Sequence, residues 1–204
     1  MVVIVDYGMG NIGSILNMVK KVGFNAKVSS CIDDLSTATK IILPGVGAFD
    51  KGVSNLQELD LIDVLKEKAL KEKIPILGIC LGMQLMTTSS EEGCLAGLDF
   101  INAKVKKFQI SDDLKVPHMG WNTIEHNKQS LLFDELKTEK RFYFVHSYYV
   151  EIESNEKEAI LTTTSYGGNF TSSFEKENII GVQFHPEKSH KYGKQLFQNF
   201  LREY

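Results

Sequence analysis

One cysteine stands between two glycines in the segment Ile-Pro-Ile-Leu-Gly-Ile-Cys-Leu-Gly, residues 74–82. The apolar residues before Cys80 predict a buried strand, and those after it predict a helix. A reactive side chain on such a sharp turn forms a nucleophile elbow, which requires small neighbours such as Gly78 and Gly82. The helix N-terminus at Leu81 offers N–H groups and a positive dipole end, which favour a thiolate and a developing oxyanion. For Cys80 taken alone, a buried structural cysteine is the alternative.

A histidine and a carboxylate follow the last predicted strand, in the segment Phe-His-Pro-Glu at residues 184–187. His185 is suited to take the proton of the Cys80 thiol, and Glu187 to fix the imidazole tautomer and to stabilise the imidazolium. A solvated turn histidine is the alternative for His185 alone. More than a hundred residues separate the cysteine from the histidine, so only the fold can bring them together.

A glycine-rich turn, Pro-Gly-Val-Gly-Ala-Phe, occupies residues 44–49. Two glycines one residue apart allow the backbone to present an N–H group toward a neighbouring strand end. The Gly47 N–H is therefore a candidate oxyanion donor that complements the N–H of Leu81. An ordinary strand-to-helix turn is the alternative.

The elements that must position these residues alternate between strand and helix over the first ninety residues. The predicted strands are Val2–Asp6, Asn25–Ser29, Ile41–Leu43 and Ile76–Ile79, and the predicted helices are Asn11–Val22, Gly52 to about Lys71, and Leu81–Thr88. This order predicts a mostly parallel sheet covered by helices on both faces, an α/β flavodoxin-like fold. Because ligands bind at the carboxyl ends of such strands, Tyr7–Gly10, Pro44–Gly47 and Cys80 should converge on one edge.

The second half of the chain is richer in strands. Strand-like runs occur at Phe100–Phe108, Trp121–Glu125, Phe142–Val150, Ala159–Thr164, Phe170–Phe174 and Ile179–Phe184. A closing helix places Leu196, Phe197, Phe200 and Leu201 on one face. The 204 residues contain no internal repeat and no linker, so we expect a single domain over residues 1–204.

Composition excludes several classes of protein. The chain is 43% hydrophobic and 24% charged with a formal net charge of −3, so we expect no nucleic-acid partner. No apolar run reaches the ~18 residues of a membrane span, and the chain opens on a predicted strand rather than a signal peptide. The three cysteines show no C-x-x-C spacing, which favours a reducing, cytoplasmic setting and no metal site.

A dinucleotide-binding motif is the main competing signal. Gly8-Met-Gly-Asn-Ile-Gly13 satisfies G-x-G-x-x-G between a strand and a helix, and Asp33 and Asp34 follow about twenty residues later. However, the second strand ends at Ser29, several residues before these acids, and no second nucleotide-binding half follows. We therefore interpret Gly8–Gly13 as a turn that leads to the site edge, and we predict no cofactor.

The remaining histidines are less informative. His118, in the segment Pro-His-Met-Gly-Trp-Asn, and His146, in Val-His-Ser-Tyr-Tyr, are expected to form structural hydrogen bonds or to lie at the rim of the site. His126 and His190 are expected at the surface.

Several separated segments resemble the class I, triad-type glutamine amidotransferases. These segments are GICLGMQL at 78–85, PGVGAF at 44–49 and QFHPEKS at 183–189. Two more, PHMGWN at 117–122 and YFVHSYY at 143–149, resemble the branch whose glutaminase subunit feeds a cyclase in histidine biosynthesis. The resemblance extends from the first strand to the last helix.

The resemblance implies an activity and site residues. It implies a catalytic triad of Cys80, His185 and Glu187, and an oxyanion hole formed by Gly47 and Leu81, whose Gly47 peptide reorients when the partner is engaged. It implies that the glutamine pocket contains Gln84, Glu92, Ser147 and Tyr148. The implied reaction is thiolate attack on the L-glutamine carboxamide, ammonia release and hydrolysis of a γ-glutamyl thioester.

The resemblance also implies a partner. The residues that match the family's contact with a (β/α)₈-barrel cyclase, in a heterodimer, are Met9, Asn11, Trp121, Tyr143 and Lys188. The cyclase would use the ammonia to make imidazole glycerol phosphate and AICAR. A paralogous branch that supplies ammonia for amidation of surface-polysaccharide sugars remains an alternative. A cysteine peptidase that needs no partner and a non-catalytic nucleotide-binding module are more distant ones.

Overall fold

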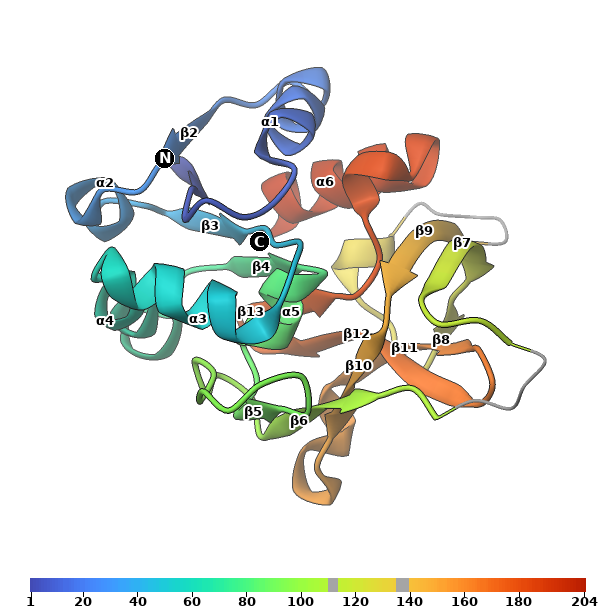
Figure 1. Ribbon diagram of the computed structural model, residues 1–204. Helices are drawn as coiled ribbons and strands as arrows, with labels where there is room; N and C mark the ends of the chain where they lie inside the picture. Colours follow the sequence, from blue (N-terminus) through green and yellow to red (C-terminus); the bar gives the residue numbers. More distant parts are fainter. Residues whose placement is uncertain (110–113, 135–139) are drawn as a thin grey trace.

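The computed structural model describes residues 1–109, 114–134 and 140–204. Within these residues, eleven strands form one large sheet and two form a small one (Figure 1). Five strands of the large sheet run parallel in the order β2-β1-β3-β4-β13. Their bounds are Ala26–Ser29, Val2–Val5, Lys40–Leu43, Ile76–Ile79 and Ile179–Val182. The predicted α/β fold with a mostly parallel sheet is confirmed.

Helices cover both faces of the parallel strands. On one face lie α1 (Ile12–Lys21) and α6 (His190–Glu203), which contact each other. On the other lie α2 (Ile32–Ser36), α3 (Phe49–Glu58) and α4 (Leu61–Lys66) (Figure 1).

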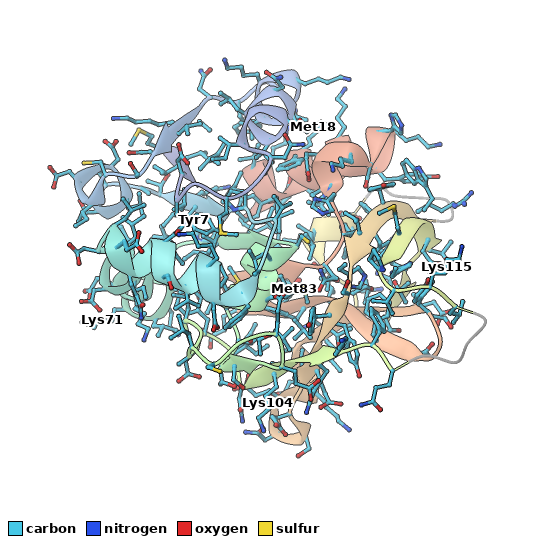
Figure 2. All side chains as sticks on the ribbon, in the orientation of Figure 1. Tyr7, Met18, Lys71, Met83, Lys104 and Lys115 are labelled. Atoms are coloured by element: carbon cyan, nitrogen blue, oxygen red, sulfur yellow. The ribbon has the colours of Figure 1, made fainter. Side chains whose placement is uncertain are left out.

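Side chains alternate between these two faces along each strand, as the period of a strand requires. In β1, Ile4 packs in the cluster that includes α1 and α6, whereas Val3 and Val5 pack in the cluster that includes α3 and α4. Tyr7 and Met83 lie in the interior of the molecule (Figure 2). Burial on both faces explains why these strands are almost wholly apolar.

Antiparallel strands extend the large sheet beyond β13, followed by the short β5, which pairs in parallel with β6. They continue in the order β12, β10, β6, β5, while β11 pairs with β12 and with β8. The bounds are β5 Ser89–Ser90, β6 Ala103–Lys107, β8 Glu125–His126, β10 Tyr148–Ile152, β11 Ile160–Ser165 and β12 Asn169–Lys176. The small sheet consists of β7 (His118–Thr123) and β9 (Arg141–His146).

The predicted strand Phe142–Val150 is wrong as a single element. It is two strands, β9 and β10, which separate at Ser147 and belong to different sheets. Both halves keep the alternation of buried and exposed residues, so periodicity alone does not reveal the break. The break is functionally important because it places Ser147 at the junction of the two sheets.

The helices differ from the prediction in three respects. The segment from Gly52 to Lys71 contains α3, α4 and a π-helical turn, because Asp60 has a positive φ of 56° between the two helices. The helix after Cys80, α5, ends at Leu85 rather than Thr88. Helix α2 was not predicted, since its five residues are too few to show a helical period.

The glycine motif at residues 8–13 lacks one structural property of dinucleotide-binding turns. The third glycine of the motif normally permits close packing of helix on strand. A side chain at Gly13 would instead meet no atom within 4 Å. Asp34, the candidate ribose ligand, is bound to Lys27 and Ser29.

Among the described residues, no helix has the length and apolarity needed to cross a bilayer.

Candidate active site

Cys80 occupies the sharp turn between β4 and α5 (Leu81–Leu85). Its φ of 54° and ψ of −109° are values that a non-glycine residue adopts only where the surrounding structure imposes them. A side chain at Gly82 would collide with the carbonyl oxygen of Leu43, and one at Gly78 would lie 2.8 Å from the Gly82 oxygen. The turn therefore has the geometry of a nucleophile elbow, with both glycines required by close backbone approach.

His185 and Glu187 form a buried pair just beyond the end of β13. Nδ1 of His185 lies 2.8 Å from Oε1 of Glu187, and both side chains are 1% exposed. Nε2 of His185 is buried and has no hydrogen-bond partner among the described residues. The imidazole interacts electrostatically with the Cys80 thiol. The fold thus brings the cysteine and the distant histidine together, with Nε2 left to exchange a proton with sulfur.

Opposing effects set the charge of the imidazole. Burial lowers the pKa of His185, but the side chains of Cys80 and Glu187 raise it more strongly, to about 10. The protonated imidazolium is therefore favoured at neutral pH, beside a carboxylate that can hold it. An imidazolium next to a cysteine favours the thiolate, which is the nucleophilic form.

The carboxyl ends of the parallel strands converge around the elbow, as the topology predicts. The Tyr7 hydroxyl, beyond β1, donates to the carbonyl oxygen of Pro44, beyond β3, at 2.6 Å. A side chain at Gly45 would meet this hydroxyl at 2.6 Å and the backbone nitrogen of Gly82 at 2.8 Å. Burial, and secondarily the Cys80 charge, raises the pKa of Tyr7. The neutral phenol of Tyr7 therefore holds the glycine-rich turn, residues 44–49, close to the elbow at Cys80.

The two candidate oxyanion donors border the same cavity but differ in their present bonding. The Leu81 N–H donates to the carbonyl oxygen of Gly45 at 3.3 Å. Gly47 is exposed at the cavity and has a φ of 117°. An oxyanion can receive the Leu81 N–H only after the Gly45 carbonyl releases it.

A cavity of about 280 Å³ opens beside the sulfur of Cys80. All four residues expected to bind glutamine line it, together with the two oxyanion candidates; they are Gln84, Glu92, Ser147, Tyr148, Gly47 and Leu81. Oε2 of Glu92 accepts the Phe49 N–H at the start of α3, at 2.9 Å. This bond fixes a carboxylate on the cavity wall, where it can meet a cationic group of a ligand.

One residue of the site, Gln183, was not singled out from the sequence. Gln183 is fully buried, and its Nε2 donates to Sγ of Cys80 at 3.7 Å while its Oε1 accepts from Gln84 at 3.0 Å. Gln183 lies two residues before His185, so its position at the end of the last strand was the available signal. Tyr7 was expected at the site edge, but its hydrogen bond to Pro44 was not predicted.

Three of the five residues expected at a partner contact form one group. Trp121 and Tyr143 lie opposite each other in β7 and β9, with ring centres 6.3 Å apart. The Lys188 ammonium lies 5.8 Å from the centre of the Tyr143 ring. His190 is exposed, as predicted, and stacks on Trp121 at 5.5 Å. Met119, in the same strand, is 62% exposed.

The other two are placed by different contacts. Asn11 precedes α1, which contacts the 3₁₀ turn that contains Lys188. A side chain at Gly47 would meet Cε of Met9 at 2.6 Å. Met9 therefore adjoins the cavity wall rather than the Trp121 group.

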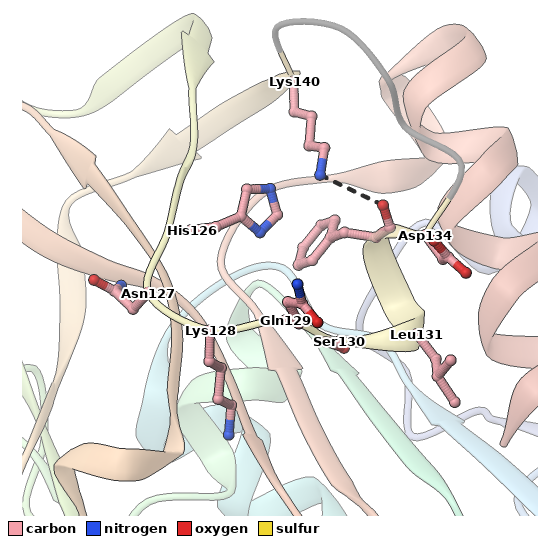
Figure 3. A pocket seen from close by; sticks show the side chains of 9 residues that line it. His126, Asn127, Lys128, Gln129, Ser130, Leu131, Asp134 and Lys140 are labelled. Carbon is pink, nitrogen blue, oxygen red and sulfur yellow. Dashed lines mark hydrogen bonds between the residues drawn. The ribbon is translucent and has the colours of Figure 1, made fainter.

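A larger cavity, of about 720 Å³, lies away from Cys80 (Figure 3). His126, an exposed residue as expected, lines it together with residues 127–131, 133, 134 and 140. The Lys140 ammonium donates to the carbonyl oxygen of Phe133, and that of Lys128 donates to the carbonyl oxygens of Glu158 and Glu175. This cavity contains no predicted site residue.

In the described part of the chain, no cluster of His, Cys, Asp and Glu could hold a metal ion.

Comparisons with known proteins place this geometry in a family. The family model described as "Glutamine amidotransferase class-I" matches residues 3–204. The imidazole glycerol phosphate synthase subunit HisH 2 of Methanococcus maripaludis is 57% identical, over 100% of both chains. The HisH 2 subunit of Pseudomonas aeruginosa is 46% identical, over 98% of both chains. A crystal structure of a glutamine amidotransferase, 16% identical, matches with a TM-score of 0.74 over 98% of this chain and 97% of that one, which shows the fold. The chain belongs to the class I glutamine amidotransferase family.

Proposed function

We propose that this chain is the glutaminase subunit of an imidazole glycerol phosphate synthase, which hydrolyses L-glutamine and passes the ammonia to a cyclase subunit. The observation that carries the proposal is the strained Cys80 elbow beside the buried His185–Glu187 pair. The full-length similarity to two imidazole glycerol phosphate synthase subunits supports the choice of pathway. A biosynthetic enzyme with reduced cysteines belongs in the cytoplasm.

The first half of the reaction forms a covalent intermediate. The Cys80 thiolate attacks the side-chain carboxamide carbon of glutamine, and the carbonyl oxygen becomes an oxyanion held by backbone N–H groups of Leu81 and Gly47. The His185 imidazolium then donates its Nε2 proton to the departing nitrogen. The carbon–nitrogen bond breaks, ammonia leaves, and a γ-glutamyl thioester remains on Cys80.

The second half regenerates the enzyme. His185, now neutral, takes a proton from water while the water oxygen attacks the thioester carbon. The carbon–sulfur bond breaks, glutamate leaves, and the thiolate–imidazolium pair is restored. Glu187 holds the Nδ1 proton throughout, so that Nε2 is the atom that exchanges protons.

The cavity fits the size and charge of an amino acid. Its volume of about 280 Å³ is small for a peptide or a nucleotide. Gln84, Ser147 and Tyr148 provide polar contacts, and the Glu92 carboxylate is suited to the α-ammonium group of glutamine. The site therefore favours a free amino acid over the peptide substrates of the peptidase alternative.

The chemistry of ammonia argues for a partner subunit. Ammonia released into neutral water is protonated and loses its nucleophilicity, so it must pass directly to the acceptor. We propose a (β/α)₈-barrel cyclase in a heterodimer, docked on the surface around Trp121, Tyr143 and Lys188, together with Asn11 before α1 and Met9 beside Gly47. The Leu81 N–H donates to the carbonyl oxygen of Gly45, and docking of the cyclase would release it toward the oxyanion, so that glutaminase turnover should be slow until the partner is engaged.

One observation favours a second candidate pathway. Both relatives are named as a numbered subunit, HisH 2. A second copy would be free to supply ammonia to a different synthase, such as one that amidates a surface-polysaccharide sugar. The glutaminase chemistry at Cys80 is the same in both candidates.

Reconstitution with each synthase distinguishes the candidates. Glutamate release by this chain is measured alone, with a histidine-pathway cyclase and its ligand, and with a sugar-amidating synthase and its sugar. We expect slow release by the chain alone and a strong increase with the cyclase, together with imidazole glycerol phosphate. An increase with the sugar-amidating synthase only would assign the second pathway. Full activity without any partner would contradict the subunit proposal.

A further inference from the structure

Two buried histidines that the mechanism does not use meet where the small sheet joins the large one. His118 begins β7 and His146 ends β9, and the two residues are partners in the register of this pair. Their side chains are 3% and 6% exposed. Nδ1 of His118 lies 3.0 Å from Nε2 of His146. A direct contact between two buried imidazoles is unusual enough to require a reason.

The surrounding partners fix which nitrogen of each ring carries the proton. Nδ1 of His146 lies 2.7 Å from the carbonyl oxygen of Tyr148, which can only accept, so this nitrogen is protonated. Nε2 of a neutral His146 must then accept, and Nδ1 of His118 donates to it. Nε2 of His118 in turn accepts from the Asn122 amide at 3.2 Å. Hydrogen bonds therefore run in one direction, from Asn122 through both histidines to Tyr148.

The environment keeps both rings neutral, as this order requires. Burial lowers the pKa of His118 to about 4. Burial also lowers the pKa of His146, to about 3, against an opposing effect of its bond to the Tyr148 carbonyl. The His118 ring stacks between Phe144 and Tyr166, with ring centres 4.8 and 4.0 Å away. A charged ring here would direct two N–H groups at each other across 3.0 Å.

The hydrogen bonds end at the wall of the glutamine cavity. The Tyr148 carbonyl accepts a second bond, from Nε2 of Gln84 at 3.2 Å. Gln84 also donates to Gln183, which donates to the sulfur of Cys80. Two donors on one carbonyl restrict the rotation of the Tyr148 peptide, which follows Ser147 on the cavity wall. The histidine pair is thus linked by hydrogen bonds to the wall of the cavity at its junction with the small sheet.

We propose that His118 and His146 are positioning residues for glutamine binding, which as two neutral Nδ1–H tautomers hold the Tyr148 peptide in the orientation that forms the pocket. The proposal rests on the proposed glutaminase function. His146 also borders the cavity and interacts electrostatically with His185, but the contact through which the pair is proposed to act is its hydrogen bond to the Tyr148 carbonyl. Their loss should therefore weaken glutamine binding more than it slows the chemical step.

The substitution His118→Phe tests this proposal. Phenylalanine keeps an aromatic ring between Phe144 and Tyr166 but removes the bond to His146. In the complex with the synthase, we expect KM for glutamine to rise by about tenfold and kcat to change by less than about threefold. The variant His118→Asn, which retains a donor near the Nδ1 position, should recover part of the loss. An unchanged KM in His118→Phe, or an equal loss in kcat alone, would overturn the proposal.

Two further measurements separate positioning from a general structural effect. Alkylation of Cys80 by iodoacetamide, which does not use the glutamine pocket, should proceed at the wild-type rate in His118→Phe. Nitrogen NMR of the wild-type imidazoles should show the neutral Nδ1–H tautomer for both residues from pH 8 to pH 5. An Nε2–H tautomer or a charged ring at His146 would overturn the proposal even if the variant fails to fold.

The outcomes distinguish this proposal from the proposed function. If the wild-type complex hydrolyses glutamine and His118→Phe does so with the same KM, only the positioning role fails. If the wild-type chain neither binds nor hydrolyses glutamine with either synthase, the glutaminase function fails, and the positioning role fails with it.

Discussion

The three cysteines of this chain illustrate how position rather than residue type creates a nucleophile. Cys31 and Cys94 are exposed, whereas Cys80 is 7% exposed. Accessibility alone would make the first two the more reactive. Cys80 differs in its strained elbow and its neighbouring imidazole. At the scale of the residue, reactivity at Cys80 is a property of the surrounding charges and backbone.

The charge state of His185 gives the first prediction. Its pKa is raised to about 10 in part by Glu187, so the wild-type imidazole should remain protonated through pH 8. The substitution Glu187→Gln removes one of the raising effects, and the titration midpoint of His185 should fall. Nitrogen NMR of the imidazole over a pH series measures both midpoints. Equal midpoints in the two proteins would contradict the role given to Glu187.

The same shift predicts how stability depends on pH. A histidine in the unfolded chain titrates near 6.5, and the folded value for His185 is higher. Its contribution to stability is therefore fully present below about pH 6.5 and is lost as the pH rises toward about 10. Between pH 7 and pH 9.5, urea unfolding should show a larger loss of free energy for the wild type than for Glu187→Gln. A larger loss in the variant would contradict this sign.

Much of the candidate site could be predicted from the sequence because its residues lie next to glycine and proline, which mark turns. Cys80 lies between glycines and His185 precedes a proline. Gln183 lies just beyond the last strand, two residues before His185, but no local pattern marks a glutamine there as a hydrogen-bond donor to a thiol. The bonding of the Leu81 N–H to Gly45 depends on the spacing of two strand ends, which no local pattern encodes.

At the scale of the element, the elbow requires two stretches of main chain to approach each other closely. Gly82 faces the Leu43 carbonyl, and a Cβ there would require backbone to move. Helix α1 contains a matched control, since a Cβ at Gly13 would meet nothing within 4 Å. Comparing an alanine at Gly82 with an alanine at Gly13 therefore separates the cost of a steric clash from the effect of helix propensity.

These glycines give the second stability prediction. The substitution Gly82→Ala should lower the free energy of unfolding by about 3 kcal/mol or more, because the added methyl group overlaps the main chain. Gly13→Ala should leave it unchanged or raise it by up to about 1 kcal/mol. Urea denaturation of both variants measures the difference. Equal effects would show that the elbow is not closely packed.

The prediction of elements succeeded where the hydrophobic period was long and failed where the chain changed sheets. The parallel strands β1, β3, β4 and β13 are largely apolar and buried, and they sit between helices of regular period, so their type was clear. The run Phe142–Val150 keeps its alternation through the break at Ser147. The division arises because Arg141–His146 pairs with β7 and Tyr148–Ile152 pairs with β6 and β12. Such long-range pairing is set by the whole fold.

At the scale of the whole molecule, the two edges of the parallel sheet differ in character. The carboxyl edge carries Cys80 and His185, and the exposed aromatic group around Trp121 adjoins it through the turn of Lys188. Lys71 precedes β4 and so lies toward the opposite edge. The proposed cyclase must dock on the first edge if ammonia is to pass between the sites.

Binding of the cyclase gives a further prediction. Trp121→Ala and Lys188→Glu should each weaken the complex by about tenfold or more, as expected for aromatic and charged residues near the centre of an interface. Lys71→Ala, at the far edge, should leave the affinity unchanged. Calorimetric titration with the cyclase measures all three. Equal affinities for wild type and Trp121→Ala would remove this surface from the proposed interface.

The central claim is that Cys80 attacks the carboxamide of glutamine. The most direct test is to incubate the wild-type chain, in complex with its synthase, with a diazoketone analogue of glutamine and to map the modified peptide by mass spectrometry. We predict modification of Cys80 alone, although Cys31 and Cys94 are the more exposed, and protection by excess glutamine. Modification of Cys31 or Cys94 with Cys80 left intact would contradict the claim.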